Sequence, residues 1–508
     1  MKKFIRLSLK GQTVLVLAAA AVLMAGTISA SWAKNGEIKD SDIVAALETE
    51  LLLDAAVDPH LIDVESNDGI VTLSGSVDTL LSSDQAVRVC ESIKGVRSVV
   101  NNITVKPVQR SDEAVREDVE NALLEDPAAD SYEIKVRVDD AVVNLSGNVD
   151  SWVEKKLCER VAKKVKGVKA VENRIDIIYK TDRPDYEIQK EIEARLKNNP
   201  FIEELLIRVA VDDGKVTLSG DVGSAAEKKR AYNLAWVSGV RSVNNEGLSV
   251  KWWWRDKMRR KDKFAGKSDS EIAAAIKDAF LYDPRVFSFK VAAEVTGGIA
   301  TLTGTVDNLK AKNAAAADAK NTIGVLRVRN RIKVRPVSPP ADAEIARHVR
   351  DALVRSSLVE SFEISVKVRN QKVSLYGTVD TYYEKTEAGD IASRVPGVAA
   401  VQNNIAVNYA WIWKSDGQIK KDIESEFFWS PFVDGSDITV SVDNGVATLT
   451  GNVDSWYEFE SATENAFEGG ANKVICKLRI RGSDDKEKTE YYFPSYPVIY
   501  NFHYYAYP

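Results

Sequence analysis

The residues that could ligate a metal or act as nucleophiles are few and far apart in the sequence. Among 508 residues the chain has three histidines and three cysteines. His60 precedes a predicted strand, His348 falls on the polar side of a predicted helix, and His503 belongs to the C-terminal tail. Isolated histidines in such unlike settings predict neither a metal site nor a catalytic group. The sequence also has no dinucleotide-binding or phosphate-binding loop, so we expect no enzyme activity, no cofactor and no small-molecule substrate.

Aromatic and basic residues together form the clearest candidate for a binding site. Three consecutive tryptophans open a basic segment at residues 252–263, and two more tryptophans followed by a lysine occur at residues 411–414. The candidate lipid-binding residues are Trp252, Trp253, Trp254, Arg255, Lys257, Arg259, Arg260, Trp411, Trp413 and Lys414. Tryptophan favours the headgroup level of a bilayer, and each nearby Lys or Arg adds about 1 kcal/mol of attraction to an anionic surface. The pattern fits contact with anionic phospholipid, and it also fits tryptophans that pack between neighbouring units.

Composition indicates a folded chain of several domains. Apolar residues make up 44% of the chain and charged residues 28%. Residues 1–33 combine a basic head, an apolar run from Val14 to Ala25 and a few small residues. This is the layout of a cleaved secretory signal peptide, and an uncleaved N-terminal anchor is the alternative. No later run approaches the roughly 18 apolar residues of a membrane span.

The charge of the exported chain restricts its partners. Residues 1–33 contain four of the 69 basic residues and no acidic one, so 65 basic and 75 acidic residues remain, a net charge of −10. A general nucleic-acid binder needs a basic surface. We therefore expect no nucleic-acid partner.

An internal repeat determines the expected domain organisation. A strand-like phrase with the pattern Leu-x-Gly-x-Val recurs six times. Its glycines are Gly75, Gly147, Gly220, Gly304, Gly377 and Gly451. A second glycine follows about 20 residues later in five copies, as Gly95, Gly167, Gly239, Gly324 and Gly397. This recurrence predicts six tandem modules.

Each copy predicts the same order of elements. Upstream of the phrase, apolar residues at every fourth position, such as Ile43, Leu47 and Leu51, mark a helix that buries one face. Two alternating runs joined by turns such as Asp68-Gly69 predict a hairpin, whose phrase glycine allows a bend without a Cβ clash. A second helix and a third strand follow. The predicted fold class is α+β, with six αββαβ modules that each place two helices on one face of a three-stranded sheet.

The start of the second helix carries two further signals. Capping boxes are predicted in four copies, at Ser151/Glu154, Ser224/Glu227, Thr381/Glu384 and Ser455/Glu458. Aromatic rings recur beside these caps, at Trp152, Tyr382 and Trp456. The rings are candidates for binding lipid or unfolded segments, and they also fit hydrophobic staples at a helix start.

The cysteines fit packing better than redox chemistry. An odd, sparse set of three is not a disulfide framework. Cys90 and Cys158 occupy second-helix positions that hold alanine in sister copies, and Cys476 lies in a predicted strand in phase with Val474 and Leu478. We therefore predict that all three are core residues.

The complete pattern resembles the BON domain family. The family's order of elements ends in G-V-x-x-V-x-N, and the matching endings are Gly95–Asn101, Gly167–Asn173, Gly239–Asn245, Gly324–Asn330 and Gly397–Asn403. In the sixth copy Glu468-Gly469-Gly470-Ala471 replaces this ending. A signal peptide followed by tandem copies is similar to the OsmY-like osmotically inducible periplasmic proteins. The resemblance implies a periplasmic, non-catalytic protein that binds phospholipid surfaces or client proteins.

These patterns predict nine segments. They are a signal peptide (1–33), BON-like repeats at 38–106, 111–179, 184–251, 268–336, 341–409 and 415–482, a Trp-rich basic linker (252–267) and an aromatic tail (483–508). The repeats are either paired or flexibly beaded, and the tail is either flexible or docked on the sixth repeat. The oligomeric state stays open.

The expected function is binding rather than catalysis. We predict a periplasmic protein that associates with anionic phospholipid or other envelope surfaces, in a role of stress protection. A chaperone-like binder of unfolded envelope proteins and a structural spacer in the envelope are the alternatives. The expected partners are therefore anionic phospholipid or envelope proteins.

Overall fold

The computed structural model describes ten stretches of the chain. They are residues 38–53, 61–126, 134–179, 182–255, 267–283, 285–286, 290–359, 364–407, 414–481 and 491–493. The predicted signal peptide, the basic run after Arg255, and Trp411 and Trp413 lie outside them. For Trp254 and Arg255 only the backbone is described.

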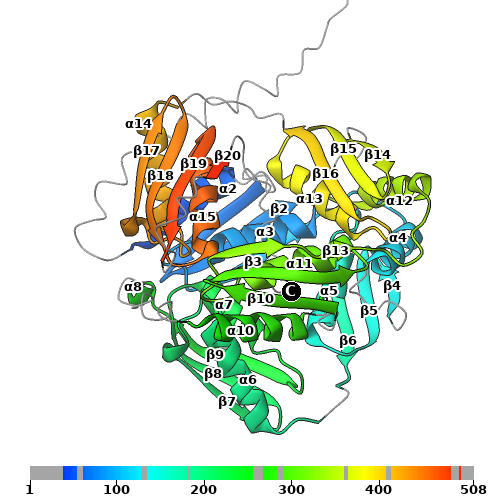
Figure 1. The fold of residues 1–508 in the computed structure, drawn as a ribbon, viewed down its shortest axis with the longest axis horizontal. Helices are drawn as coiled ribbons and strands as arrows, with labels where there is room; N and C mark the ends of the chain where they lie inside the picture. The colour runs from blue at the N-terminus through cyan, green and yellow to red at the C-terminus, as the bar shows by residue number, and fades with distance from the viewer. Residues whose placement is uncertain are drawn as a thin grey trace, which may run out of the picture.

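The predicted fold class is confirmed, with six α+β modules in chain order that we number 1 to 6 (Figure 1). The first helices are α2 (Asp40–Leu53), α4 (Asp112–Glu125), α6 (Asp185–Asn198), α10 (Asp269–Tyr282), α12 (Asp342–Arg355) and α14 (Asp416–Trp429). The second helices are α3 (Leu80–Glu91), α5 (Trp152–Lys163), α7 (Ala225–Leu234), α11 (Leu309–Lys320), α13 (Tyr382–Arg394) and α15 (Trp456–Glu468). Short 3-10 helices, η4 (Glu204–Leu206) and η7 (Gly435–Asp437), precede the sheets of modules 3 and 6.

Each module has one sheet built around the second strand of its hairpin. The hairpins are β1 (Ile62–Asn67) with β2 (Ile70–Val77), β4 (Lys135–Asp139) with β5 (Val142–Val149), β7 (Ile207–Asp212) with β8 (Lys215–Val222), β10 (Val291–Thr296) with β11 (Ile299–Val306), β14 (Ile364–Arg369) with β15 (Lys372–Val379), and β17 (Ile438–Asp443) with β18 (Val446–Val453). The third strands are β3 (Ser98–Val105), β6 (Ala170–Ile177), β9 (Ser242–Val250), β16 (Ala400–Val407) and β19 (Lys473–Ile480), and module 4 divides this strand into β12 (Arg327–Asn330) and β13 (Lys333–Val334). The hairpins are antiparallel, and every third strand runs parallel to the central strand. Parallel neighbours need a crossover connection, which the second helix provides.

Part of the aromatic tail docks on module 6. Strand β20 (Tyr491–Phe493) pairs antiparallel with β19, and Tyr491 lies opposite Cys476. The tail therefore adds a fourth strand to this sheet at these three residues.

The helical stripes and the cysteines lie in the module cores, as predicted. Ile43, Leu47 and Leu51 of α2 are at most 2% exposed, and the other first helices repeat this pattern. Cys90, Cys158 and Cys476 are fully buried and free of disulfides. Burial raises the pKa of the Cys90 thiol to about 12 and that of Cys476 to about 11. Thiols held in this protonated form are poor nucleophiles, which agrees with a packing role.

The phrase glycines lie where two backbones approach closely. Gly75 has a φ of +113°, and a Cβ built on it would lie 2.0 Å from the carbonyl oxygen of Leu61. Gly220, Gly304 and Gly451 meet the equivalent carbonyl at 2.0 to 2.1 Å. A side chain at these positions would collide with the start of the first hairpin strand, and L-residues disfavour this φ.

The predicted caps form, but three of the four differ from a reciprocal capping box. The side chains of Ser151, Ser224, Thr381 and Ser455 each accept the N–H three residues later. Only at Thr381 does the glutamate return a bond to the cap residue itself. In the other three the glutamate accepts the N–H of the residue before the cap. Glu227 and Glu458 also accept an N–H from the segment before η4 or η7, which draws the carboxylate away from the cap.

The first residue of each first helix is an aspartate whose carboxylate accepts hydrogen bonds from the hairpin turn of the same module. Asp40 accepts the N–H groups of Asp68 and Gly69 at 2.8 and 2.9 Å. The equivalent aspartates are Asp112, Asp185, Asp269, Asp342 and Asp416, and each accepts two turn N–H groups. A hydrogen bond from Ser66 and these backbone bonds lower the pKa of Asp40. The sequence signal for this contact is an Asp that always stands 29 residues before the second turn residue.

The modules pair through the ends of their first helices. The same hydrogen bond recurs in three pairs of modules. The donor is the backbone N–H of the residue before the second glycine of one module, and the acceptor is the carbonyl of the last residue of the first helix in the other module. The donor and acceptor pairs are Lys94 N with Trp429 O (2.9 Å), Lys166 N with Arg355 O (2.8 Å) and Ile323 N with Asn198 O (3.3 Å). Modules 1 and 6, 2 and 5, and 3 and 4 are therefore paired in the same way.

Modules 1–3 also form a ring, and modules 4–6 form a similar group, the second ring, in which module 4 contacts modules 5 and 6. In the five modules whose side chain is described at this position, the first residue of the second helix packs against a neighbouring module. Leu80 contacts the core of module 2, Trp152 stacks on Trp236 of module 3, Ala225 joins the core of module 1, Leu309 joins that of module 5, and Trp456 contacts that of module 4. An ion pair repeats as well, because Lys163 binds Asp84 at 3.0 Å in the first ring and Lys320 binds Glu460 at 2.6 Å in the second.

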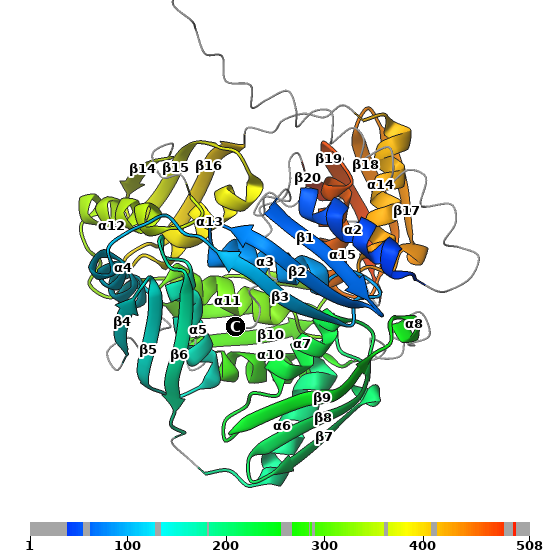
Figure 2. The same cartoon turned by 180° about the vertical axis from the view of Figure 1, so that it is seen from behind.

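The repeated contacts relate modules 1–3, the first ring, by an approximate threefold axis, and the three pairs join them to modules 4–6, the second ring. The second helices α3, α5 and α11 lie near the middle of both views (Figures 1 and 2). Of the two arrangements left open by the sequence, paired modules are present and flexibly beaded modules are not.

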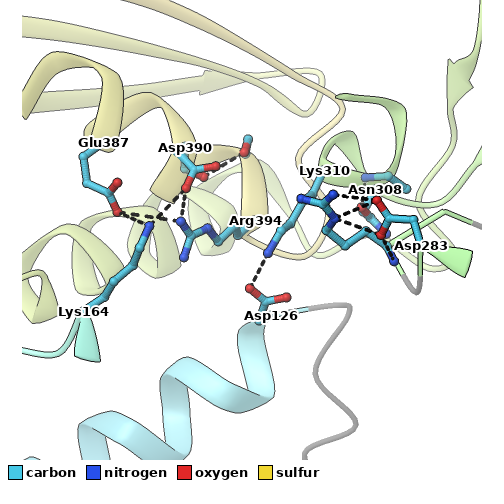
Figure 3. A network of polar contacts seen from close by, with 11 residues as sticks. Asp126, Lys164, Asp283, Asn308, Lys310, Glu387, Asp390 and Arg394 are labelled. Atoms are coloured by element: carbon cyan, nitrogen blue, oxygen red, sulfur yellow. Dashed lines mark hydrogen bonds and ion pairs between the residues drawn. The ribbon is translucent and has the colours of Figure 1, made fainter. Parts of the chain in front are cut away.

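A buried polar network joins modules 2 and 5 (Figure 3). Lys164 Nζ lies 2.7 Å from Glu387 Oε1 and 3.4 Å from Asp390 Oδ2, and Arg394 also binds Asp390. The side chains of Lys164 and Glu387 are only 9% and 3% exposed. Burial by itself would raise the pKa of Glu387, but Lys164 and Arg394 hold it below its ordinary value.

A second buried pair in Figure 3 joins modules 2 and 4. Lys310 Nζ lies 2.6 Å from Asp126 Oδ2, and the aspartate side chain is 1% exposed. Burial lowers the pKa of Lys310 to about 7, although Asp126 favours the charged ammonium. Inter-module contacts of this fold therefore include desolvated charges as well as apolar side chains.

The interface of modules 1 and 6 predicts a pH-dependent stability. Glu426 of α14 is buried and shares a hydrogen bond with Glu50 of α2. Burial, Glu50 and Glu468 raise its pKa well above the ordinary value, against the opposing charge of Lys414. The folded chain thus keeps a proton that the unfolded chain releases above about pH 4.5, so the free energy of unfolding falls as pH rises through the folded pKa. We expect Glu426→Gln to stabilise the protein by about 1 kcal/mol or more at pH 8 and to change little at pH 4.

Urea denaturation at both pH values measures this effect. Glu424→Gln is the matched control, because Glu424 lies on the same helix with a 52% exposed side chain. Equal stabilisation by the two variants at pH 8 would show that the buried carboxyl pair is not the cause.

Candidate functional site

The two tryptophans of the predicted lipid site whose side chains are described, Trp252 and Trp253, have different environments. The helix α8 (Trp252–Arg255) follows the sheet of module 3 directly. Trp252 is half-buried, and the Lys94 ammonium of module 1 lies 5.6 Å from the centre of its ring. The same ammonium lies 4.6 Å from the ring of Phe428 in module 6. Trp252 therefore contributes to a junction of modules, as the packing interpretation requires.

Trp253 has the opposite environment. Its ring meets that of Trp252 edge-on, with centroids 6.1 Å apart, yet 47% of the residue is exposed. Among the tryptophans whose side chains are described, the others are buried or half-buried. The helix lies at the periphery beside the β7–β9 sheet (Figure 2). An exposed indole that leads directly into the basic run is the accessible part of this site.

Lys414, the last predicted lipid contact, is bound within module 6. Its Nζ lies 2.7 Å from Asp422 and 3.4 Å from the carbonyl oxygen of Gly469, and its side chain is 14% exposed. Arg110 and Arg183 occupy the same place in modules 2 and 3, and each binds an acid eight residues later. This link between the start of a module and its first helix was not predicted from the sequence. Its signal is a basic residue that precedes an Asp or Glu by eight positions.

Two rings at second-helix starts are inter-module contacts. Trp152 is 6% exposed and stacks on Trp236 at 5.4 Å with an angle of 4° between the ring planes. Trp456 is partly buried against the cores of modules 4 and 6. Packing between modules therefore accounts for the positions of these two rings. The side chain of Tyr382 lies outside the described side chains.

The residues that the structure describes contain neither a candidate membrane span nor a candidate metal site. In this part of the chain no helix has the length and apolar character needed to cross a bilayer. Within the same residues, no three His, Cys, Asp or Glu side chains are grouped as metal ligands.

The sequence comparison with protein families agrees with the module boundaries. The BON domain model matches residues 39–107, 111–179, 184–251, 268–336, 341–409 and 415–482. These matches account for most of the chain. The chain belongs to the BON domain family.

A curated relative supports the same assignment. Osmotically-inducible protein Y of Escherichia coli (strain K12) is 33% identical over 141 residues, which cover 26% of this chain and 70% of that protein. Among solved structures, CdsD of Chlamydia trachomatis, described as a structural protein of a type III secretion system, is 16% identical over 44% of this chain and 92% of the CdsD chain. Its C-terminal domain is 18% identical over 45% of this chain and all of that domain. Both have a TM-score of 0.13 and carry no argument here.

Proposed function

We propose that this BON protein is a non-catalytic, exported protein of the periplasm that binds anionic phospholipid surfaces peripherally. Its relative in Escherichia coli is named for osmotic induction, and we extend a role in osmotic stress to this chain. The observation that carries the proposal is Trp253, 47% exposed at the start of a basic segment in an acidic protein. An indole enters the headgroup region while Lys and Arg attract anionic lipid.

Vesicle flotation with the mature protein tests this proposal. We expect binding to vesicles that contain phosphatidylglycerol, weak binding to pure phosphatidylcholine, and loss of binding as salt rises from about 0.05 to about 0.5 M. Trp253→Ala should weaken the binding about tenfold, because the buried area of one large apolar side chain is lost.

Tyr376→Ala is the matched control for Trp253→Ala. Tyr376 is an aromatic residue of module 5, 41% exposed, with the Lys367 ammonium 5.5 Å from its ring. The control should bind vesicles as the parent does. Failure of the parent to float with either lipid at low salt, or equal losses in the two variants, would contradict the proposal.

A chaperone-like role is the second candidate, since Leu205 and Val337 expose apolar side chains at 85% and 80%. It predicts that the protein suppresses aggregation of a denatured model protein, and that Trp253→Ala leaves this activity unchanged. The third alternative, an extended spacer, fits the structure less well because modules 1–3 close into a ring and each pairs with one of modules 4–6.

A further inference from the structure

A cavity of about 620 Å³ lies where the second helices of the first ring meet. Equivalent positions of α3, α5 and α7 line it. Five residues after the N-caps stand Asp84, Lys156 and Lys229, and nine residues after them stand Arg88, Arg160 and Asn233. Because the same positions of three related modules converge, the cavity lies on the approximate threefold axis of modules 1–3.

The lining of this cavity is strongly basic. Seven lining residues are Lys or Arg, and three are Asp or Glu. Two of the basic residues, Lys163 and Lys164, are paired with acids of modules 1 and 5. Even without them, the basic side chains outnumber the acidic ones in a protein whose overall charge is negative.

The second ring has the opposite charge at the same positions. Five residues after the N-caps it has Asn313, Thr386 and Glu460, and nine residues after them Ala317, Asp390 and Glu464. The six positions therefore hold three acids and no base in the second ring, against four bases and one acid in the first. Because the modules of both rings share one fold, the basic character belongs to the first ring and is not a requirement of that fold.

One end of the cavity is aromatic. The rings of Phe201, Phe432 and Tyr457 lie 4.8 to 5.5 Å apart in mutual contact. The Arg230 guanidinium, on a residue only 9% exposed, lies 5.2 Å from the ring of Tyr457 and 5.6 Å from that of Phe201. Trp152 adds a further ring to the wall. A basic wall beside an aromatic surface favours a ligand with both anionic and ring-shaped parts.

We propose that this cavity binds a small organic anion with at least two negative charges and a planar ring, of the size of a nucleotide. Arg side chains bind phosphate and carboxylate oxygens with paired hydrogen bonds, and the ligand's charge offsets the excess of bases. The cavity volume lies within the range of small-molecule sites, about 300 to 1,000 Å³. The ligand is bound and not converted, so the site goes beyond the proposed lipid-binding function and leaves the protein non-catalytic.

Isothermal titration of the full mature protein at low salt tests the site with three probes. Adenosine 5′-diphosphate carries both features, pyrophosphate carries the charge alone, and adenosine carries the ring alone. We expect the diphosphate to bind more tightly than pyrophosphate, and adenosine to give no measurable binding. The double variant Arg88→Gln/Arg160→Gln should weaken diphosphate binding by at least about tenfold, because two charge-assisted contacts are lost.

Lys169→Gln/Arg174→Gln is the matched control, with the same charge change on side chains that are 45% and 72% exposed in module 2. It should bind the diphosphate as the parent does. Because the Arg88/Arg160 variant could fold poorly, Lys229→Gln, at an exposed residue of the lining, provides a second variant with an expected loss of severalfold. Trp253→Ala should leave the affinity unchanged, which separates this site from the lipid surface. Absence of diphosphate binding by the parent, or equal losses in cavity and control variants, would overturn the proposal.

Discussion

Replacement of Gly451 by alanine is expected to destabilise module 6 by at least about 3 kcal/mol. Gly451 has a φ of +133°, and a Cβ would lie 2.0 Å from the carbonyl oxygen of Asp437. Neither group can move without disturbing the β17–β18 register, in which Ile438 lies opposite Gly451. The alanine would therefore be destabilised twice at this position, by the unfavourable positive φ and by the clash of its Cβ with the backbone. Chemical denaturation, followed by hydrogen exchange in β17 and β18, measures the loss.

Gly417→Ala is the matched control in the same module. Gly417 lies in the first turn of α14, and a Cβ there would meet nothing within 4 Å. Alanine is the better helix former, so this change should stabilise the helix by about 0.5 kcal/mol. Similar effects of the two alanine substitutions would show that the close approach at the phrase glycine is not what makes glycine necessary.

Removal of the Lys164 ammonium should have the second large effect, a loss of about 3 kcal/mol. In Lys164→Met the carboxylate of Glu387, 3% exposed, loses its partner at 2.7 Å. Arg394, at 3.7 Å, compensates only in part. Because an unpaired buried charge costs far more than the pair contributes, Lys164→Met/Glu387→Met should recover most of the stability. A double-mutant cycle by urea denaturation measures the coupling between modules 2 and 5.

Lys156→Met controls for the loss of a lysine, because Lys156 lies in α5 and Lys164 is the C-cap residue of that helix. Lys156 binds Glu159 at 2.9 Å, but its side chain is 37% exposed. Partly solvated pairs of this kind contribute little, and we expect a change below about 1 kcal/mol. If Lys164→Met were no more harmful than Lys156→Met, or if the double variant were as unstable as the single one, the buried network would not hold the rings together.

The modules themselves could be predicted because their determinants are local. The spacing of Ile43, Leu47 and Leu51 specifies a helix and the face that it buries, and the turn at Asp68-Gly69 specifies a hairpin. Gly75 is required by a contact between neighbouring strands of one hairpin, close in sequence. Six copies of each signal reinforce one another, which is why the fold class, the core cysteines and the cap positions agree with the structure.

The candidate site could be predicted only in part. Trp252 and Trp253 are adjacent and chemically identical, yet the Lys94 ammonium of another module lies over the ring of Trp252 while Trp253 is exposed. Lys414 resembles a surface cation in the sequence, but Asp422 binds it. The cavity of the first ring has no local signature, because Arg88 and Arg160 come together only when separate modules close around an axis.

The sequence by itself determined the six modules and the side chains that each module buries in its own core. Tertiary structure alone decided which modules meet. The apolar periodicity of a helix predicts that one face is buried, but it does not predict which residues cover the rest of the helix surface. Lys164 and Glu387 stand 223 residues apart, and no pattern of neighbouring residues connects them. The pairs, the rings and the charge around the axis of the first ring depend on contacts between modules. Each module already has its own core, so these contacts can be known only when the modules are placed together.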